Sequence, residues 1–247
     1  MKMATSSRDT KRRNQLSIVI PVFNEKESFP KTYRAIKKHI SQNHNIYVVY
    51  DFDEDTTVPV VKKLQKKDDK LFLVKNTIGR GPLNALKSGF LAVKDGPLLV
   101  VMADLSDDLA DVDKMVELYK AGNNIVCGSR YVSGGRQIGG PYLKRTLSHL
   151  AGVSLFYLRG IPTHDVTNNF KLYDASMLHN LAIESTQGFC IAMEITVKGY
   201  LHGESIAEVP TIWRDRTDGE SNFKLWSWLP QYIRWYLFAF RPKNKSL

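Results

Sequence analysis

The stretch that most constrains the fold is Leu98–Met102, a run of five apolar residues that stops just before a carboxylate, Asp104. A short apolar run without polar alternation predicts a strand buried on both faces, as in a parallel sheet. Open α/β sheets bind ligands at the carboxyl ends of their strands, where carboxylates suit a divalent cation and phosphates. Asp107 and Asp108 follow closely and either join such a site or cap the next helix. Because Asp104 precedes the usual capping position, we predict that it binds a metal ion.

Strands and helices alternate along the first half of the chain. Apolar runs predict strands at residues 16–20, 46–50, 71–74, 98–102 and 124–127, and helical spacing predicts helices at 26–41, 57–67, 83–94 and 110–120. This alternation is typical of an α/β fold with a mostly parallel central sheet flanked by helices. The strand at 46–50 also ends in acid, at Asp51 and beyond, and two acidic strand ends at one edge are costly unless a cation neutralises them. We therefore expect a divalent ion, Mg²⁺ or Mn²⁺.

The pattern changes after Gly128. The later elements are a glycine-rich segment at 133–140, expected to be mobile, helices at 142–158, 175–181, 190–200 and 226–240, strands at 170–173 and 205–209, and a charged loop at 214–221. The last helix is rich in aromatic residues. We therefore divide the chain into a disordered basic head at 1–15, an α/β domain at 16–225, and a C-terminal aromatic helix with a basic tail at 226–247.

Composition narrows the class of partner. The 247-residue chain has a formal net charge of +10, which favours an anionic partner such as a phosphorylated substrate or an acidic membrane surface. No nucleic-acid-binding motif accompanies the charge, so we expect no nucleic acid. Gly-x-Gly-x-x-Gly and phosphate-loop sequences are absent, which disfavours dinucleotide-binding and ATPase functions.

The cellular location is predicted from what the sequence lacks. Residues 1–15 have no apolar core of a secretory signal, and no apolar run reaches the length of a membrane span. Cys127 and Cys190 have neither metal-type spacing nor the pattern of a disulfide framework, which favours a reducing compartment. We expect a cytoplasmic protein, either free or peripheral at the cytoplasmic face of a membrane.

Several segments follow one another in a recognisable order. They are Ser17–Glu25, Tyr50–Thr57, Asn76–Gly81, Ala103–Ser106, Gly128–Tyr131, Asp165–Phe170, Glu208–Pro210 and Arg216–Ser221. Their number, order and spacing resemble those of family 2 glycosyltransferases, which have the GT-A fold, and most closely the polyprenyl- or dolichyl-phosphate mannose or glucose synthases. The resemblance implies inverting, metal-dependent transfer of a hexose from a nucleoside diphosphate sugar, UDP- or GDP-linked, to a polyprenyl phosphate.

The resemblance also implies roles for individual residues. The nucleotide sugar would contact Pro21, Glu25, Asp51, Arg80, Ala103 and Asp104. Asp104, with Asp107, would hold the metal, and Arg130, Arg145, Ser148 and Thr167 would bind the acceptor phosphate. Arginine suits that role because it pairs with phosphate oxygens through two hydrogen bonds. Arg216 would clamp the diphosphate from a closing loop, which makes Asp104, Arg216 and Asp165 the catalytic set.

Departures from the family pattern leave alternatives open. Tyr50 and Met102 stand where the family has aspartates, and Ser106 replaces a metal-side amide. A catalytically weak homologue that binds a nucleotide is one alternative. Another is transfer to a sugar hydroxyl in polysaccharide or glycolipid synthesis, which would need a general base, Asp165 or Glu194.

The aromatic helix carries Gln231-x-x-Arg234-Trp235, a motif of processive polysaccharide synthases. Since no membrane span flanks it, we interpret the motif as chance or as a packing feature. The helix either packs on the core, dimerises or lies on a membrane, so a homo-oligomer and a membrane partner are both open possibilities.

Overall fold

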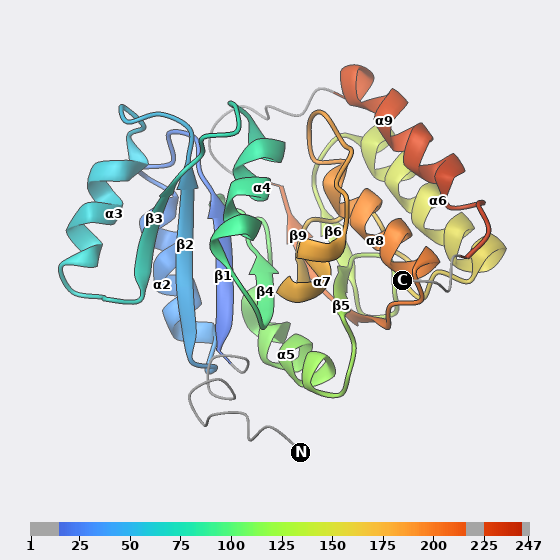
Figure 1. The fold of residues 1–247 in the computed structure, drawn as a ribbon, viewed down its shortest axis with the longest axis horizontal. Helices are drawn as coiled ribbons and strands as arrows, with labels where there is room; N and C mark the ends of the chain where they lie inside the picture. Colours follow the sequence, from blue (N-terminus) through green and yellow to red (C-terminus); the bar gives the residue numbers. More distant parts are fainter. Residues whose placement is uncertain (1–14, 216–224, 244–247) are drawn as a thin grey trace, which may run out of the picture.

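A seven-stranded sheet runs through the centre of the molecule (Figure 1). The computed structural model describes residues 15–215 and 225–243 of the chain. The strand order is β3-β2-β1-β4-β7-β5-β8. The strands are β1 (Leu16–Pro21), β2 (His44–Tyr50), β3 (Leu71–Lys75), β4 (Pro97–Val100), β5 (Ile125–Ser129), β7 (Lys171–Asp174) and β8 (Ile206–Pro210).

The sheet is mostly parallel, as the alternation of elements predicted. β1 pairs in parallel with β2 and β4, β2 with β3, and β5 with β8. β7 is the exception, because it lies antiparallel between β4 and β5. β4, which contains the first three residues of the predicted apolar run, is therefore a central strand, and each of its residues is buried. The prediction of a strand covered on both faces is confirmed.

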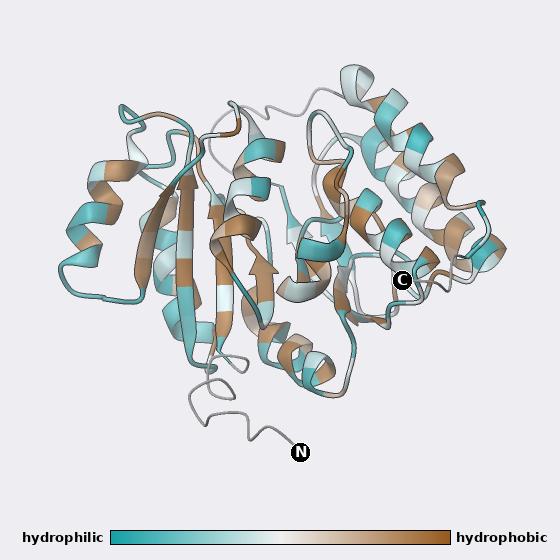
Figure 2. Ribbon diagram, in the orientation of Figure 1, coloured by the Kyte–Doolittle hydropathy of each residue, from teal (hydrophilic) through white to brown (hydrophobic). Residues whose placement is uncertain are grey.

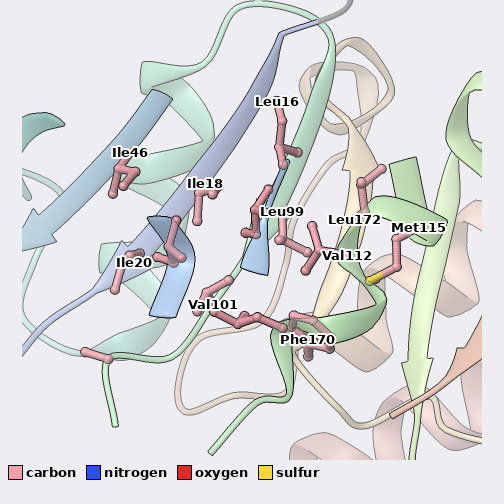
Figure 3. Packing of buried hydrophobic residues seen from close by; sticks show 14 of the residues in the cluster. Leu16, Ile18, Ile20, Ile46, Leu99, Val101, Val112, Met115, Phe170 and Leu172 are labelled. Atoms are coloured by element: carbon pink, nitrogen blue, oxygen red, sulfur yellow. The ribbon is translucent and has the colours of Figure 1, made fainter. Parts of the chain in front are cut away.

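Helices cover both faces of the sheet. On one face lie α2 (Phe29–His39), α3 (Thr57–Gln65), the short 3-10 helix η1 (Leu109–Asp111) and α5 (Val112–Lys120). On the other face lie α4 (Pro82–Ala92), α7 (Ala175–Asn180) and α8 (Ile191–Leu201). Alternate residues of β1 separate the two cores: Ile18 and Ile20 join Leu99, Val112 and Phe170 (Figure 3), whereas Val19 packs under α4.

Helix α4 approaches the sheet closely at Gly89. A Cβ atom built there would lie 2.3 Å from Cγ1 of Val19 and 3.1 Å from Cγ2 of Val49. We expect Gly89→Val to lower the free energy of unfolding by about 1–3 kcal/mol, because overpacking a filled core forces the helix away from the sheet. Urea denaturation measures this. The matched control is Leu91→Val, at an exposed position of the same helix, which should change stability by only about 0.5 kcal/mol; equal losses for both variants would contradict the prediction.

A second, two-stranded sheet was missed by the sequence analysis. β6 (Arg136–Ile138) lies in the glycine-rich segment that was expected to be mobile, and it pairs in parallel with β9 (Ile212–Arg214). Three residues are too few to show the alternation that marks a strand. Gly134 and Gly139 flank β6 in the left-handed region, with φ of 92° and 79°, which explains why glycine is required there.

The C-terminal helix α9 (Leu225–Phe238) packs against α8 and against α6 (Tyr142–Arg159), at the right-hand edge of Figure 1. A third apolar cluster lies beneath it, centred on the buried rings of Trp228 and Trp235. Within residues 15–215 and 225–243, no helix is long and apolar enough to cross a membrane. The predicted basic head lies outside the described residues except for Gln15, whereas Arg241 and Lys243 of the predicted basic tail are described. The division into a head, one domain and an appended helix stays a prediction.

Candidate active site

The loops that follow β1 and β2 are tied together at the carboxyl edge of the sheet. The fully buried Asp55 accepts hydrogen bonds from the backbone N–H groups of Asn24 (3.1 Å) and Thr57 (2.8 Å). Asn24 adopts the left-handed φ of 57°, and its side-chain oxygen accepts a hydrogen bond from the Thr56 N–H at 3.1 Å. The Glu25 N–H in turn donates to the Thr57 hydroxyl at 2.9 Å. These contacts fix Glu25, the predicted nucleotide contact, just beyond the end of β1.

Asp51 holds the turn that follows β3. One carboxylate oxygen accepts from the N–H of Gly81 at 2.8 Å, and the other accepts from the Asn76 amide at 2.7 Å. Asn76 also donates to the Gly79 carbonyl at 2.6 Å, which closes the turn that carries Arg80. The structure thus brings Asp51 and Arg80 together at one edge, as the resemblance implied. Their contact with a nucleotide stays a prediction.

A pair of aromatic rings, Phe23 exposed and Phe52 half-buried, lies beside Arg80 and was not singled out by the sequence analysis. The guanidinium carbon of Arg80 lies 5.2 Å from the ring centroid of Phe52, and the Phe52 ring meets Phe23 edge-on at 5.7 Å. Both rings come directly after strand ends, at the same edge as Asp51. A cation over an aromatic face is an attractive arrangement. The available clue was the position of these phenylalanines next to Asn24 and Asp51 within the quoted motifs.

The three aspartates after β4 have different partners. Asp104 accepts from the Ser106 N–H at 3.1 Å, around a Leu105 whose φ is 61°. Asp107 reaches back to accept from the Met102 N–H at 3.0 Å. Asp108 accepts from the Ala110 N–H at 3.0 Å and so caps η1, which confirms the capping alternative for this residue alone.

Electrostatics at this edge fit a cation. The pKa of Asp107 is raised to about 7, chiefly by burial; the Met102 N–H opposes the shift and the Asp104 charge adds to it. A divalent ion between or beside the two carboxylates would relieve that repulsion. No group of three or more His, Cys, Asp or Glu side chains suited to a metal occurs in the described part of the chain. Mg²⁺ is nevertheless commonly held by one or two carboxylates together with water and substrate phosphates, which this edge could provide.

The remaining residues predicted for the donor site lie nearby. Pro21 is the last residue of β1, and Ala103 is buried, with its carbonyl accepting from the Thr32 hydroxyl at 2.8 Å. Arg216, the predicted diphosphate clamp, lies outside the described residues, as does the rest of its loop up to residue 224. Its role therefore stays a prediction.

Three of the four predicted acceptor residues meet in one polar cluster, buried at Arg130 and half-buried at its hydroxyl groups. We call it the Arg130 cluster, and it consists of Arg130, Asp165, Ser148, Thr167, Tyr131 and Gln137. Arg130 and Asp165 form a two-pronged ion pair, with Nε–Oδ2 at 2.6 Å and Nη2–Oδ1 at 2.9 Å. Burial alone would raise the pKa of Asp165, but the charge and hydrogen bonds of Arg130 outweigh it and hold the pKa below its usual value. The carboxylate of Asp165 is therefore ionised at neutral pH and bound to the Arg130 guanidinium.

Hydroxyl groups complete the Arg130 cluster. Nη2 of Arg130 also donates to Ser148 at 2.9 Å and to Thr167 at 3.0 Å, and these two hydroxyls bond each other. The Tyr131 hydroxyl donates to Ser148 at 3.0 Å. Arg145, in contrast, contributes its backbone carbonyl, 3.4 Å from the Tyr131 hydroxyl, while the residue itself is exposed. The structure thus gathers Arg130, Ser148 and Thr167 as predicted, and leaves the side chain of Arg145 at the surface.

A buried lysine, not foreseen from the sequence, holds the loop that carries Asp165. The ammonium group of Lys171, at the start of β7, donates to the backbone carbonyls of Asp165 (2.8 Å) and Asn168 (2.7 Å). The side-chain amide of Asn168 donates to the Gly128 carbonyl at 2.9 Å. The polar residues of this loop thus join it to β5. No spacing rule indicates a buried lysine in a strand, so the sequence offered no clue.

Glu194, the other candidate base, has a structural role in α8. Its carboxylate accepts from the ammonium group of Lys198 at 2.7 Å and from the N–H groups of Glu184 (2.5 Å) and Ser185 (2.8 Å), and it is fully buried. Such a carboxylate has no access to an acceptor hydroxyl.

The Gln-x-x-Arg-Trp motif of α9 docks on the same segment. Gln231 donates to the Thr186 hydroxyl at 2.8 Å, Arg234 pairs with Glu184 at 3.4 Å, and the Trp235 indole donates to the Ser185 hydroxyl at 2.8 Å. All three motif residues thus contact residues 184–186. The interpretation of the motif as a packing feature agrees with these contacts.

Solved structures with a similar fold are glycosyltransferases. Glucosyl-3-phosphoglycerate synthase from Mycobacterium tuberculosis, in complex with Mn²⁺, UDP-glucose and phosphoglyceric acid, superposes with a TM-score of 0.67 at 14% identity, covering 99% of this chain and 87% of that chain. The same enzyme with Mn²⁺, UDP and glucosyl-3-phosphoglycerate gives a TM-score of 0.66 at 15% identity, covering 94% and 81%. At this level of identity the likeness shows the fold, and it confirms the predicted GT-A class.

Curated relatives are more similar in sequence. Polyprenol monophosphomannose synthase of Mycolicibacterium smegmatis is 27% identical over 210 residues, 83% of this chain and 79% of the relative. Dolichol-phosphate mannosyltransferase of Pyrococcus furiosus is 28% identical over 215 residues, 85% of this chain; this chain spans only 59% of the length of that relative. Residues 17–182, about two thirds of the chain, match the family model described as Glycosyl transferase family 2. The chain belongs to glycosyl transferase family 2.

Proposed function

We propose that this protein transfers a hexose from a nucleoside diphosphate sugar to a polyprenyl phosphate. Two curated relatives carry names of that activity, with polyprenol and dolichol phosphate as acceptors. The observation that carries the proposal is the Arg130 cluster, in which a buried arginine lies among hydroxyl groups while the carboxylate beside it is already paired. Hydroxyl donors and cations suit a phosphate oxygen.

The state of the two candidate bases favours a phosphate over a hydroxyl acceptor. A sugar hydroxyl must lose its proton to attack, so it needs a nearby base of suitable pKa. Asp165 is bound to Arg130 with a lowered pKa, and Glu194 is bound to Lys198 and two N–H groups. A phosphate is already an anionic nucleophile and needs neither carboxylate. The paired state of both carboxylates therefore argues against hydroxyl transfer.

Lys144 supplies the cation that the exposed Arg145 does not. It precedes Ser148 by four residues on α6, and residues four apart lie on the same face of a helix. Its ammonium group lies 6.0 Å from the ring centroid of Trp213, and Trp213 forms a backbone bridge with Asp107. Lys144 thus lies on the side of α6 that carries Ser148 and near the ring of Trp213, whose backbone pairs with Asp107. A phosphate nucleophile must reach the anomeric carbon in this region.

The nucleotide sugar would bind at the carboxyl edge of the sheet. Asp104, with Asp107 beside it, would hold Mg²⁺ or Mn²⁺, and the ion would stabilise the charge that builds on the leaving diphosphate. Asp51, Arg80 and Glu25 would position the nucleotide against the strand ends. Whether UDP or GDP is preferred depends on contacts with the base at the turn held by Asp51.

A transfer assay tests the proposal. The purified protein is given radiolabelled UDP- or GDP-hexose, Mn²⁺, and either a short, water-soluble polyprenyl phosphate or a sugar acceptor with free hydroxyls. We expect label in the lipid phosphate alone. Label only in the sugar acceptor would overturn the assignment.

The same assay tests the role of Lys144. We expect Lys144→Met to raise the KM for the phosphate acceptor by about tenfold, the effect of losing one charged partner worth roughly 1.4 kcal/mol. Arg145→Met is the matched control, since it removes a neighbouring cation from the exposed face, and its KM should stay within about twofold. Equal effects of the two substitutions would show that bulk charge, and not position, binds the acceptor.

A further inference from the structure

The two short strands β6 and β9, which we call the β6–β9 ribbon, connect two parts of the candidate site. β1 and β4 of the central sheet are mainly hydrophobic (Figure 2), whereas β6 consists of the exposed Arg136, the buried Gln137 and the exposed Ile138. A three-residue strand with two polar side chains has little apolar surface to bury, so hydrogen bonds specify its position. The partners of those hydrogen bonds indicate what the ribbon can do.

One edge of the β6–β9 ribbon is bonded to the loop after β4, which carries the predicted metal ligands. The backbone N–H of Arg214 in β9 donates to the carbonyl of Ser106 at 2.9 Å, and Trp213 forms a backbone bridge with Asp107. A shift of β9 would therefore shift the backbone between Asp104 and Asp107, and a ligand that fixes this loop also fixes β9.

The other edge of the ribbon reaches the Arg130 cluster through one side chain. Gln137 is paired with Trp213 in the register of β6 and β9. Its side-chain oxygen accepts from Nη1 of Arg130 and from the Tyr131 hydroxyl, each at 3.2 Å. Nη2 of the same guanidinium bonds to the hydroxyl groups of the cluster, so the Gln137 contact fixes the direction in which that nitrogen points.

The start of the ribbon is held against the end of β5. The N–H of Thr211 donates to the carbonyl of Ser129 at 2.9 Å, and a Cβ atom at Gly135 would clash with the same carbonyl oxygen. Ser129 directly precedes Arg130 in the chain. The ribbon therefore has little freedom to move at one end without moving at the other.

We propose that Gln137 is a positioning residue through which the β6–β9 ribbon couples the two halves of the site. A nucleoside diphosphate with a divalent ion at the loop after β4 and a phosphate at the Arg130 cluster then bind cooperatively. The first ligand orders the loop, the ribbon and the Arg130 guanidinium together, so the second ligand meets a site that has already lost its conformational freedom. Such coupling is reciprocal. It rests on the proposed function, from which both ligands are taken, and adds how their two sites communicate.

Isothermal titration calorimetry of the full chain tests the coupling with ligands that cannot react with each other. The probes are geranyl phosphate, a short prenyl phosphate, and Mn²⁺ with UDP or, in a parallel series, with GDP. The Kd of geranyl phosphate is measured without and with saturating Mn²⁺ and nucleotide, and the ratio of the two Kd values is the readout. We expect a ratio of about five or more, and the same ratio when the order of addition is reversed.

Two variants interrupt the ribbon at its two ends. Gln137→Leu removes the acceptor for Arg130, and Arg214→Pro removes the N–H that bonds to Ser106. We expect each variant to lower the ratio to less than about two, the lower limit of a measurable coupling. The matched controls are Ile138→Ala, at the exposed neighbour of Gln137, and Arg214→Ala, which keeps the backbone N–H, and both should keep the parent ratio.

The outcomes separate this coupling from the proposed function. If both ligands bind the parent protein with a ratio near one, the coupling is wrong and the proposed function stands. If neither ligand binds, both are wrong. A parent ratio that survives in Gln137→Leu and in Arg214→Pro would assign the cooperativity to direct contact between the ligands and would also overturn the role of the ribbon.

Hydrogen exchange of the parent protein gives a second test that needs no variant. Mn²⁺ with nucleotide, added alone, should slow exchange of the Arg136 N–H in β6, which donates to the Thr211 carbonyl. Geranyl phosphate, added alone, should slow exchange of the Arg214 N–H, which donates to Ser106. Unchanged exchange at both amides under saturating ligand would contradict the coupling.

Discussion

Asp104→Ala is expected to lower the rate of hexose transfer by about 100-fold or more, without unfolding the protein. Asp104 lies in the loop after β4, where its carboxylate accepts a hydrogen bond from the Ser106 N–H. Removal of a group that stabilises developing charge typically costs a factor of 10²–10³ in rate. The rate should be measured as label transferred to the lipid phosphate over a titration of Mn²⁺.

The adjacent aspartates provide the control. Asp108→Ala removes the cap of η1, which should lower stability by about 1 kcal/mol and leave transfer nearly unchanged. If Asp104→Ala kept the parent rate at saturating Mn²⁺, the predicted metal site would be wrong. The alternative of a weak nucleotide-binding homologue, which the family departures at Met102 and Ser106 suggest, would then be favoured.

Asp165→Ala is expected to lower the free energy of unfolding by about 3–5 kcal/mol, the largest effect that we predict on stability. It leaves the buried guanidinium of Arg130 without its anion, and removal of one partner of a buried ion pair typically costs that much. Urea denaturation at pH 7 measures the loss. The control is Arg234→Met, which breaks the half-exposed pair with Glu184 and should cost less than about 1 kcal/mol.

The pH dependence of the same pair has a definite sign. Because the pKa of Asp165 is lower in the folded protein than in the unfolded chain, protonation favours unfolding. Its contribution is complete above the unfolded value of about 3.9 and is lost as the pH falls through the folded value. Asp165→Asn should therefore flatten the acid limb of the stability curve. An unchanged acid limb in that variant would show that other carboxylates control acid unfolding.

The sequence predicted most of the sheet because a strand that is buried on both faces appears in the sequence as a continuous apolar run. Leu98–Met102 could hardly belong to anything but a central strand, and its neighbours followed from alternation. No local sequence pattern indicated that β7 pairs between β4 and β5, because this antiparallel insertion depends on contacts between residues that are far apart along the chain. The short strands β6 and β9 were missed for a different reason, which is that three residues define no period.

The sequence predicted which residues belong to the candidate site but not the hydrogen bonds that connect them. Motif matches brought Arg130, Asp165 and Ser148 to notice, but side chains 18 and 35 residues apart gave no indication that they bond one another. The choice between Lys144 and Arg145 depends on the phase of α6. The structure shows that Arg145 is exposed and that Lys144 is half-buried on the side of α6 that carries Ser148, and the acceptor contact of either residue stays a prediction.

The antiparallel position of β7 has a consequence for the order in which the protein can assemble. Residues up to about 120 contain four adjacent strands and their helices, so the strands of this half can pair as soon as they are synthesised. β5 cannot join it, because β4 and β5 are both bonded to β7, which is 42 residues further along than the end of β5. Until Lys171–Asp174 emerge, one edge of β4 is an open template for other strands. A chain truncated before Lys171 should therefore aggregate, and the half that contains the Arg130 cluster is completed last.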